Sequence, residues 1–384
     1  MFAFTAKSLF TPLEQIDHPL LLVEDGRVVE IASRSSRALP QNARLIDYGD
    51  TVLVPGFVDV HIHGGGGHDV MERDTSALPV IQGVLAKHGV TSYLPTTVTA
   101  PLDTTLTSLE RLATAIEDAA KNQSSPGAQP LGIHLEGPFL NHLRRGVHPP
   151  ADLLAPTLQV FNRLWEASRG HMRIMTIAPE LNGAMEVIAE ATKRGVCVSM
   201  GHSDATLAQA RAGADAGARH ITHIFNAMRP FEHRDPGIAG EALTNSALSA
   251  EMIADGIHLD PVTVRLVLQT KGVEKTVLVT DATSATDMPD GRYRLGPFEF
   301  EVKDGRCLSN GKLAGSILTM DLAVRNVMQF AGLNLQQALR AATLNPAKVA
   351  GTDRGALQAG GWADFLAMSQ AGEIKKTILR GREI

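Results

Sequence analysis

The sequence has few cysteines and no long run of apolar residues. No stretch approaches the ~20 consecutive apolar residues that cross a bilayer, so we expect no membrane span. The N-terminal segment lacks a basic flank followed by a long apolar core, and we therefore expect no signal peptide. The two cysteines, Cys197 and Cys307, lie far apart, and Cys197 falls in an expected buried strand. A buried thiol is therefore favoured there over a ligand or nucleophile, and a cytoplasmic location is the default expectation.

A strong charge of one sign is also absent. The net charge is −5 over 384 residues, and both signs are mixed along the chain. This pattern favours neither nucleic acid nor a membrane surface as a partner. There is no internal repeat or low-complexity segment, and the polar stretch 122–129 is expected to be a loop. The length leaves room for one large and one small domain, as in a soluble metabolic enzyme.

The most informative segment that is present is VPGFVDVHIHGGGG (54–67). Residues 52–60 form an apolar run that predicts a buried strand, and the run ends in His61-x-His63. Residues two apart in a strand point to the same side, so both imidazoles leave the strand end together. Paired neutral imidazoles on a rigid strand end suit a divalent metal, although two histidines bonded to loops would show the same pattern.

Seven further apolar runs with strand character follow, and most end in histidine or an acidic residue. The polar residues at or near these ends are His134, Glu136, His202, His220, His223, Asp255, His258 and Asp281. Two runs, 91–97 and 174–180, have no obvious metal ligand. Helical patterns with capping signals lie between the runs, at 77–88, 186–194, 207–216 and 261–271.

This alternation predicts a (β/α)8 barrel. The strand ends recur about every 31 residues, as a barrel of ~250 residues requires. In that fold the active site lies at the carboxyl ends of the strands, where all these polar residues fall. A doubly wound open sheet is the rival fold, but it would gather its ligands at one switch point rather than from five or six strands.

The two ends of the chain do not show the strand–helix alternation of the barrel. Residues 1–51 and 351–384 contain short alternating segments that cannot bury a core alone, so we expect them to form one small β-sandwich. The barrel is then expected over 52–350. Within it, residues 284–315 contain Asp290-Gly291 and Asp304-Gly305 and predict a β-hairpin flap over the barrel mouth.

Two sets of candidate metal ligands follow from the barrel. Glu136, His202 and His223 supply a carboxylate and two imidazoles from three strands, an open site with room for water. His61, His63 and Asp281 form a second set, with Glu136 between the two. Each histidine taken singly could be a satisfied core residue, but several on one barrel face favour metal binding.

Several motifs together carry a resemblance to a known family. PGFVDVHIH at the first strand, single histidines after strands five and six, and an aspartate after strand eight resemble the amidohydrolase superfamily. Within it, nearly the whole chain is similar to the N-acetylglucosamine-6-phosphate deacetylases. The motifs that carry this similarity are IHLEGPF (133–139), MGHSDA (200–205), THIFNAM (222–228), PGIAG (236–240), IADGIH (253–258), VTDAT (279–283) and LAGS (313–316).

The resemblance implies roles for particular residues. Asp281 is expected to move the proton between water and the departing amine, and His148 to orient or polarise the acetyl carbonyl. Many amidohydrolases bridge two metals with a modified lysine, and the third strand here offers Glu136 instead, which argues against dihydroorotase and hydantoinase functions. One or two divalent metals per chain are expected, with zinc favoured over iron, manganese or cobalt.

The resemblance also implies a substrate site for a phosphorylated amino sugar. Arg234 and His258 resemble the phosphate-binding pair, and the arginine loop implies a homodimer in which each subunit completes its partner's site. Leu313, Ala314 and Gly315 are expected to cover the sugar. The remaining expected contacts are Val147, Asn226, Ala227 and Asp255. Two alternatives stay open: a deacetylase of N-acetylgalactosamine 6-phosphate or another N-acyl compound, and a non-catalytic binding protein of the same fold.

Overall fold

A closed barrel of parallel strands forms the centre of the molecule. The computed structural model describes residues 1–11, 14–74, 76–121 and 126–384, so the expected loop at 122–129 falls partly outside it. Within these residues the barrel strands follow one another in chain order: β8 (Phe57–Ile62), β11 (Val90–Thr97), β13 (Ile133–Glu136), β14 (Met172–Ile177), β15 (Cys197–Met200), β16 (His220–Ile221), β17 (Ser249–Met252) and β18 (Thr276–Leu278). Just beyond β18, Ala282 pairs with Ile62 and closes the ring. The predicted barrel is confirmed.

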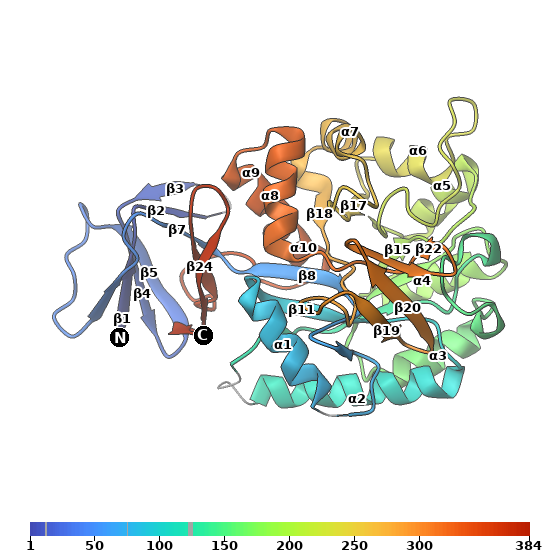
Figure 1. Cartoon of the computed structure of the whole chain (residues 1–384), viewed down its shortest axis with the longest axis horizontal. Helices are drawn as coiled ribbons and strands as arrows, with labels where there is room; N and C mark the ends of the chain where they lie inside the picture. The colour runs from blue at the N-terminus through green and yellow to red at the C-terminus, as the bar shows by residue number, and fades with distance from the viewer. Residues whose placement is uncertain (12–13, 75, 122–125) are drawn as a thin grey trace.

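Helices surround the barrel (Figure 1). They are α1 (Ala77–Lys87), α2 (Leu102–Lys121), α3 (Leu158–Ala167), α4 (Ala184–Lys193), α5 (Leu207–Ala216), α6 (Gly237–Thr244), α7 (Pro261–Lys271) and α8 (Met320–Ala331), followed by α9 (Leu335–Ala342) and α10 (Leu344–Val349). Their ends follow local chemistry: the Asp260 side chain caps α7 by accepting from the amide of Val262, and α5 ends at Gly217. No helix in the described ranges has the length and apolar character needed to cross a membrane.

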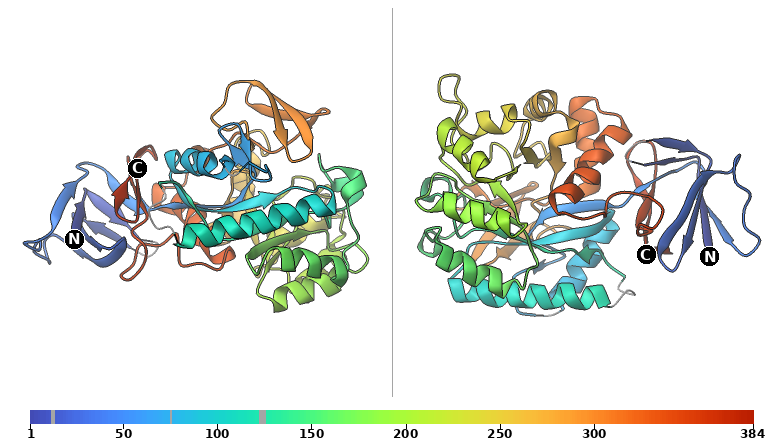
Figure 2. Two further views of the ribbon diagram at one scale, coloured as in Figure 1. Left: turned by 90° about the horizontal axis from the view of Figure 1, so that it is seen from below. Right: turned by 180° about the vertical axis from the view of Figure 1, so that it is seen from behind.

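Both chain ends meet in a β-sandwich beside the barrel, as predicted (Figures 1 and 2). One sheet has the order β5-β4-β1-β6, and the other β25-β24-β23-β7-β2-β3. Phe4 and Phe365 pack edge to face between the sheets, with ring centroids 5.0 Å apart. The strands are β1 (Phe2–Thr5), β2 (Ser8–Phe10), β3 (Gln15–Asp17), β4 (Pro19–Glu24), β5 (Arg27–Ser33), β6 (Arg44–Asp47), β7 (Val52–Pro55), β23 (Phe365–Met368), β24 (Ile374–Leu379) and β25 (Arg382–Glu383).

The strand expected at 52–60 is in fact two strands in two sheets. β7 belongs to the sandwich, between β2 and β23, whereas β8 begins the barrel. Gly56 separates them where the backbone passes close to Thr91: a Cβ at residue 56 would lie 2.2 Å from the Thr91 Oγ1. Every residue of both strands is buried, so hydrophobicity alone does not reveal the change of sheet.

The flap over the barrel mouth is larger than the predicted hairpin. It is a four-stranded antiparallel sheet of β19 (Gly291–Leu295), β20 (Phe298–Lys303), β21 (Arg306–Ser309) and β22 (Lys312–Leu313). Asp304 and Gly305 form the expected tight turn, and Asn310 and Gly311 form a second one, all four with positive φ. Gly291 instead starts β19, so the turn expected at Asp290-Gly291 is not a hairpin. Figure 2 (left) shows this sheet standing above the barrel.

Candidate metal centre and active site

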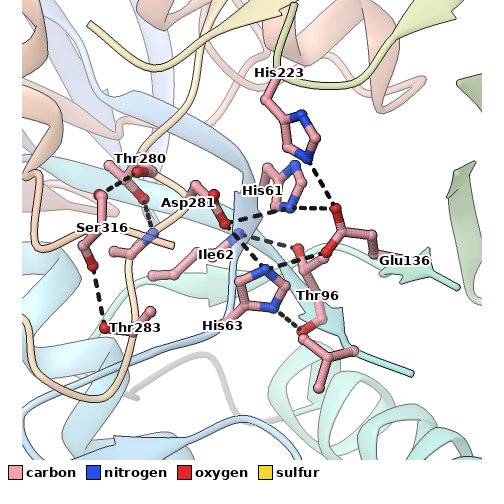
Figure 3. A network of polar contacts seen from close by, with 12 residues as sticks. His61, Ile62, His63, Thr96, Glu136, His223, Thr280, Asp281, Thr283 and Ser316 are labelled. Atoms are coloured by element: carbon pink, nitrogen blue, oxygen red, sulfur yellow. Dashed lines mark hydrogen bonds and ion pairs between the residues drawn. The ribbon is translucent and has the colours of Figure 1, made fainter. Parts of the chain in front are cut away.

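The six predicted metal ligands converge at the carboxyl end of the barrel, and Figure 3 shows all of them except His202. His61 and Glu136 lie at the carboxyl ends of β8 and β13, and the others come just after β8, β15, β16 and β18. All six are at most 8% exposed. The set is His61, His63, Glu136, His202, His223 and Asp281.

The carboxylate of Glu136 lies at the centre of this group. Its Oε1 is 3.1 Å from the Nε2 of His202, 3.2 Å from that of His223 and 3.5 Å from that of His61. Its Oε2 is 3.4 Å from the Nε2 of His63. Glu136 therefore touches both ligand sets, in the position expected of a bridging residue.

Asp281 completes the second set from the opposite side. Its Oδ1 lies 3.1 Å from the Nε2 of His63 and 3.6 Å from that of His61. These three residues offer ligand atoms close enough together to hold one ion. The two predicted ligand sets thus share one buried space.

Unusual backbone conformations aim three of these side chains. His202, His223 and Asp281 have φ of 49°, 25° and 50°, in the left-handed region that L residues seldom adopt. Each follows a barrel strand, and the change of direction turns its side chain toward the other ligands. Neighbouring groups hold the strained backbone: the amide of Asp281 donates to the carbonyl of His61 at 2.9 Å. Strain of this kind concentrates at functional sites.

The outer nitrogens of the histidines show which atoms face the centre. The Nδ1 of His63 lies 2.9 Å from the carbonyl oxygen of Thr96, and the Nδ1 of His202 lies 3.0 Å from that of Arg144. A carbonyl can only accept, so each Nδ1 carries a hydrogen, and in the neutral ring each Nε2 presents a lone pair to the site. The Nε2 of His61 is buried with no hydrogen-bond partner among the described residues. Converging lone pairs of this kind fit a cation.

The electrostatics of the site agree with this fit. Although burial opposes ionisation, the positive charge of His61 and the hydrogen bonds of neighbouring histidines hold the pKa of Glu136 well below its ordinary value. Burial lowers the pKa of His202 to about 4 and keeps its ring neutral. The pKa of His63 is raised to about 9 because its bonds to Asp281 and Glu136 outweigh burial. Ionised carboxylates and neutral imidazoles are the ligand forms that divalent metals bind, and a metal would displace the histidine protons.

His148 faces the same space but presents a hydrogen rather than a lone pair. The amide of Thr99 donates to its Nδ1 at 3.2 Å, so the neutral ring carries its hydrogen on Nε2. That Nε2 lies 3.6 Å from the Oε2 of Glu136. His148 is therefore oriented as a donor into the site.

His134 lies beneath the site and has no free ring nitrogen. Its Nδ1 donates to the carbonyl of Val60 at 2.9 Å, and its Nε2 pairs with the hydroxyl of Thr176 at 2.8 Å. Its ring packs edge to face on His61, and burial lowers its pKa to about 3. We assign His134 a packing role under the ligands.

A cavity of about 230 Å³ opens over the candidate ligands. Its walls come from the loops after the barrel strands and from the flap. Of the predicted substrate contacts, it is lined by Val147, Asn226, Ala227, His258, Leu313 and Gly315. Asp281 and His148 line it as well, so substrate would meet the expected proton carrier and the expected donor together.

The other predicted contacts lie outside this lining. Asp255 instead holds His258, accepting from its Nδ1 at 2.7 Å and from its amide at 2.7 Å. Ala314 is buried behind the wall, with its amide bonded to the carbonyl of Cys307. Arg234 is exposed and lies in the loop that precedes α6. This loop projects from the molecule in Figure 1.

The loop that carries Asp281 is tied to the end of the flap. The amide of Ser316 donates to the carbonyl of Asp281 at 2.8 Å, and the Ser316 hydroxyl donates to the carbonyl of Thr280 at 2.6 Å (Figure 3). Gly315 makes this approach possible: it has φ +59°, and a Cβ there would lie 2.8 Å from the carbonyl oxygen of Asp281.

Several residues around the site were missed by sequence reasoning. Lys312 and Leu295 of the flap line the cavity, and Glu251 and Asp59 lie buried below the ligands. A signal existed for the last two, because a carboxylate within an otherwise apolar, buried strand needs a polar partner. The flap residues carried no comparable signal.

Comparison with known proteins agrees with the geometry. Residues 52–384 match the amidohydrolase family. The chain is 36% identical to the N-acetylgalactosamine-6-phosphate deacetylase of Escherichia coli O157:H7, over 98% of this chain and 97% of that protein. It is also 36% identical to the N-acetylglucosamine-6-phosphate deacetylase of Bacillus subtilis (strain 168), over 97% and 94%.

A solved structure is similar throughout. A variant of N-acetyl-D-glucosamine-6-phosphate deacetylase from Mycobacterium smegmatis, in complex with N-acetyl-D-glucosamine-6-phosphate, matches with a TM-score of 0.93 at 35% identity. The match covers 100% of this chain and 98% of that one. The chain therefore belongs to the amidohydrolase family and, within it, to the group formed by the N-acetylglucosamine-6-phosphate deacetylases.

Proposed function

We propose that this protein hydrolyses the acetamide of N-acetyl-D-glucosamine 6-phosphate to D-glucosamine 6-phosphate and acetate. The observation that carries the proposal is the cavity, which is lined by members of both ligand sets, Asp281 among them, and by His148. Relatives with this reaction in their names cover nearly the whole chain. A non-catalytic barrel would have no need to keep these groups together.

The chemistry of an amide explains why these residues are needed. Hydrolysis requires an activated water, a polarised carbonyl and a proton for the leaving nitrogen. When bound, a divalent metal supplies Lewis acidity toward water and carbonyl oxygen. Asp281, ionised and facing the cavity, accepts the proton of the attacking water and returns it to the departing amine. Its neighbour His63, 3.1 Å away, holds the carboxylate in place.

His148 fits the role of carbonyl donor. Its Nε2 hydrogen points into the cavity because Thr99 occupies its other nitrogen. A donor placed there stabilises negative charge that develops on the acetyl oxygen. The position close to Glu136 keeps that donor beside the candidate metal ligands.

We propose that two divalent ions bind, with zinc favoured and iron, manganese or cobalt as alternatives. The Glu136, His202 and His223 set is expected to bind more tightly than the set with His61 and His63. In the His61→Ala/His63→Ala double variant, elemental analysis should still find about one metal per chain. Complete loss of metal would show that the two sets are not independent.

For the substrate phosphate, we propose contacts from His258 and from Arg234 of a partner subunit. Arg234 is exposed and does not line its own cavity, which is consistent with a homodimer that shares its sites. Lys312 is the single lysine or arginine among the described residues that line the cavity, and we add it as a second cation for the phosphate. We also propose a cytoplasmic location, which fits two cysteines that form no disulfide with each other.

Acetate release tests the proposal directly. The metal-loaded protein should release acetate from N-acetylglucosamine 6-phosphate, and a chelator should abolish the activity. The galactosamine epimer is the second candidate substrate, because a relative of equal identity carries that name. The ratio of kcat/KM for the two epimers decides between them, and no release from either would refute the proposed function.

A further inference from the structure

A carboxylate beneath the site touches both candidate metal sets. Glu251 lies in β17, the seventh barrel strand, and is 0% exposed. It is not itself among the six predicted ligands. Its two oxygens face different groups, and these contacts define what it does.

The Oε2 atom of Glu251 faces the ligands. The Nδ1 of His61 lies 2.9 Å away, and the backbone amide of His223 donates to the same oxygen at 3.1 Å. An amide can only donate, so Oε2 is an acceptor, and His61 donates its Nδ1 hydrogen to it. In the neutral ring, the form that binds a metal, the Nε2 of His61 then carries a lone pair directed at Glu136 and Asp281, whose oxygens lie 3.5 and 3.6 Å away.

The contact with His223 matters for a second reason. His223 has φ +25°, a conformation that needs support from its surroundings. Its amide is held by Glu251 instead of by an ordinary strand partner. One oxygen therefore sets the ring of a ligand in one set and the backbone of a ligand in the other.

The Oε1 atom faces away from the ligands. It pairs with the Nε2 of His220 at 3.2 Å, and the Nδ1 of His220 lies 2.7 Å from the hydroxyl of Ser249. These hydrogen bonds lead toward the opposite end of the barrel. His220 and Ser249 supply matched control positions, since they bond on the Oε1 side of Glu251 and not to a predicted ligand.

We propose that Glu251 is a positioning residue that holds His61 and His223 in their ligating geometry and so sets the metal affinity of the site. The inference rests on the metal-dependent function proposed above. A carboxylate that orients a ligating histidine fixes its tautomer and ring direction, and its loss typically weakens metal binding roughly 10–100-fold.

The test measures zinc binding by the metal-free, full-length protein in competition with a chromophoric chelator. Glu251→Gln keeps the volume but removes the charge, and its amide oxygen can no longer serve both donors fully. We expect its affinity for Zn²⁺ to fall roughly 10–100-fold. Ser249→Ala and His220→Gln alter the hydrogen bonds on the Oε1 side of Glu251, and both variants should bind Zn²⁺ like the native protein. Urea unfolding of each metal-free variant checks that the fold is intact.

The possible outcomes separate the claims. Native-like zinc affinity in Glu251→Gln would overturn the positioning role, and so would an equal loss in Ser249→Ala or His220→Gln. If Glu251→Gln does not fold, Glu251→Asp replaces it, since the shorter side chain keeps the charge but withdraws it from His61. A native protein that binds no zinc would refute the metal site itself, whereas a native protein with zinc and activity isolates the role of Glu251.

Discussion

Two buried aspartates, one at the barrel mouth and one in the sandwich, differ in the groups that balance their charge. Asp364, in the sandwich, is 7% exposed and Asp281, at the barrel mouth, is 8% exposed. Asp364 pairs with the guanidinium of Arg354 and accepts from the amide of Arg380 at 2.8 Å. In the described part of the chain, the ion-pair partners of Asp281 are the imidazole nitrogens of His63 and His61, at 3.1 and 3.6 Å. The guanidinium of Arg354 neutralises the charge of Asp364. Asp281 instead lies where a bound metal ion would supply the neutralising charge.

The comparison teaches how to recognise a functional cluster. In the sandwich, Trp362 also lies under three guanidinium groups, those of Arg27, Arg354 and Arg380, within 5.2 Å of the ring centroid. Such a cluster is closed, because its charges are paired or stacked within it. At the barrel mouth, imidazole nitrogens and carboxylate oxygens converge in positions from which they could bind a metal. Closed clusters should control stability, and the open one should control metal binding and turnover.

The largest expected effect is on turnover in the open cluster. Asp281→Asn fills the same space but cannot accept the proton of water, so kcat should fall ~100-fold or more while KM changes little. Metal analysis in parallel should show that the ion held by Glu136, His202 and His223 is retained. Near-normal turnover with metal bound would show that another residue moves the proton.

The matched change in the closed cluster should act on stability. Asp364→Asn leaves the Arg354 guanidinium buried without its counter-charge, and the free energy of unfolding should fall by about 3–5 kcal/mol. The measurement is urea unfolding, with kcat per folded molecule as the control. A fall in kcat with unchanged stability would reverse the assignment of the two clusters.

Substrate charge gives an intermediate effect. Arg234→Ala should raise KM for the phosphorylated sugar by roughly tenfold or more, because a guanidinium binds phosphate through paired donors. Activity on unphosphorylated N-acetylglucosamine should hardly change. Lys312→Met is the companion variant, with a smaller expected rise because an ammonium acts as a point charge. Equal effects on both sugars would remove these residues from the phosphate site.

The smallest expected effect concerns a closed cluster at the base of the flap. His88 lies between Asp287 and Asp321, at 2.9 and 3.0 Å, beside Lys87 and Arg325. Although burial opposes it, the bonds to Asp321 and Asp287 raise the pKa of His88 above its ordinary value of 6.5. Its contribution to stability is therefore full below pH 6.5 and is lost as pH rises through the folded-state pKa.

The variant His88→Gln measures this contribution. At pH 6 it should be less stable than the native protein by roughly 1 kcal/mol or less, and the difference should shrink by pH 9. Thermal unfolding midpoints at both pH values test the sign. A difference that grows with pH would mean that the folded-state pKa is lowered instead.

The barrel could be predicted because its signals are local. Each ligand stands at or just after the end of its own apolar strand, and parallel strands bring those ends to one face. Sequence therefore identified the six residues from His61 to Asp281 that converge in the structure. The division at Gly56 was missed because β7 and β8 are both buried on all sides, and an unbroken apolar run fits either sheet.

Residues that act across the barrel could not be predicted. The contact of Glu251 with His61 joins positions 190 residues apart and depends on the size and register of the closed ring. Lys312 reaches the cavity because four short strands fold back over the mouth, and nothing in KLAGS itself indicates where that sheet lies. Such relations arise from packing between elements rather than from patterns within one.

The place of β7 in the sandwich has a consequence for the order in which the chain folds. Its neighbour on one side, β2, is made before it, but its neighbour on the other side, β23, is made roughly 300 residues later. During synthesis the Val52–Pro55 edge must therefore wait unpaired while the whole barrel emerges. An exposed apolar strand edge can pair with another chain, so association of nascent chains should be most harmful in this interval. β7, which directly precedes the strand that carries His61, therefore pairs with its second neighbour only late in synthesis.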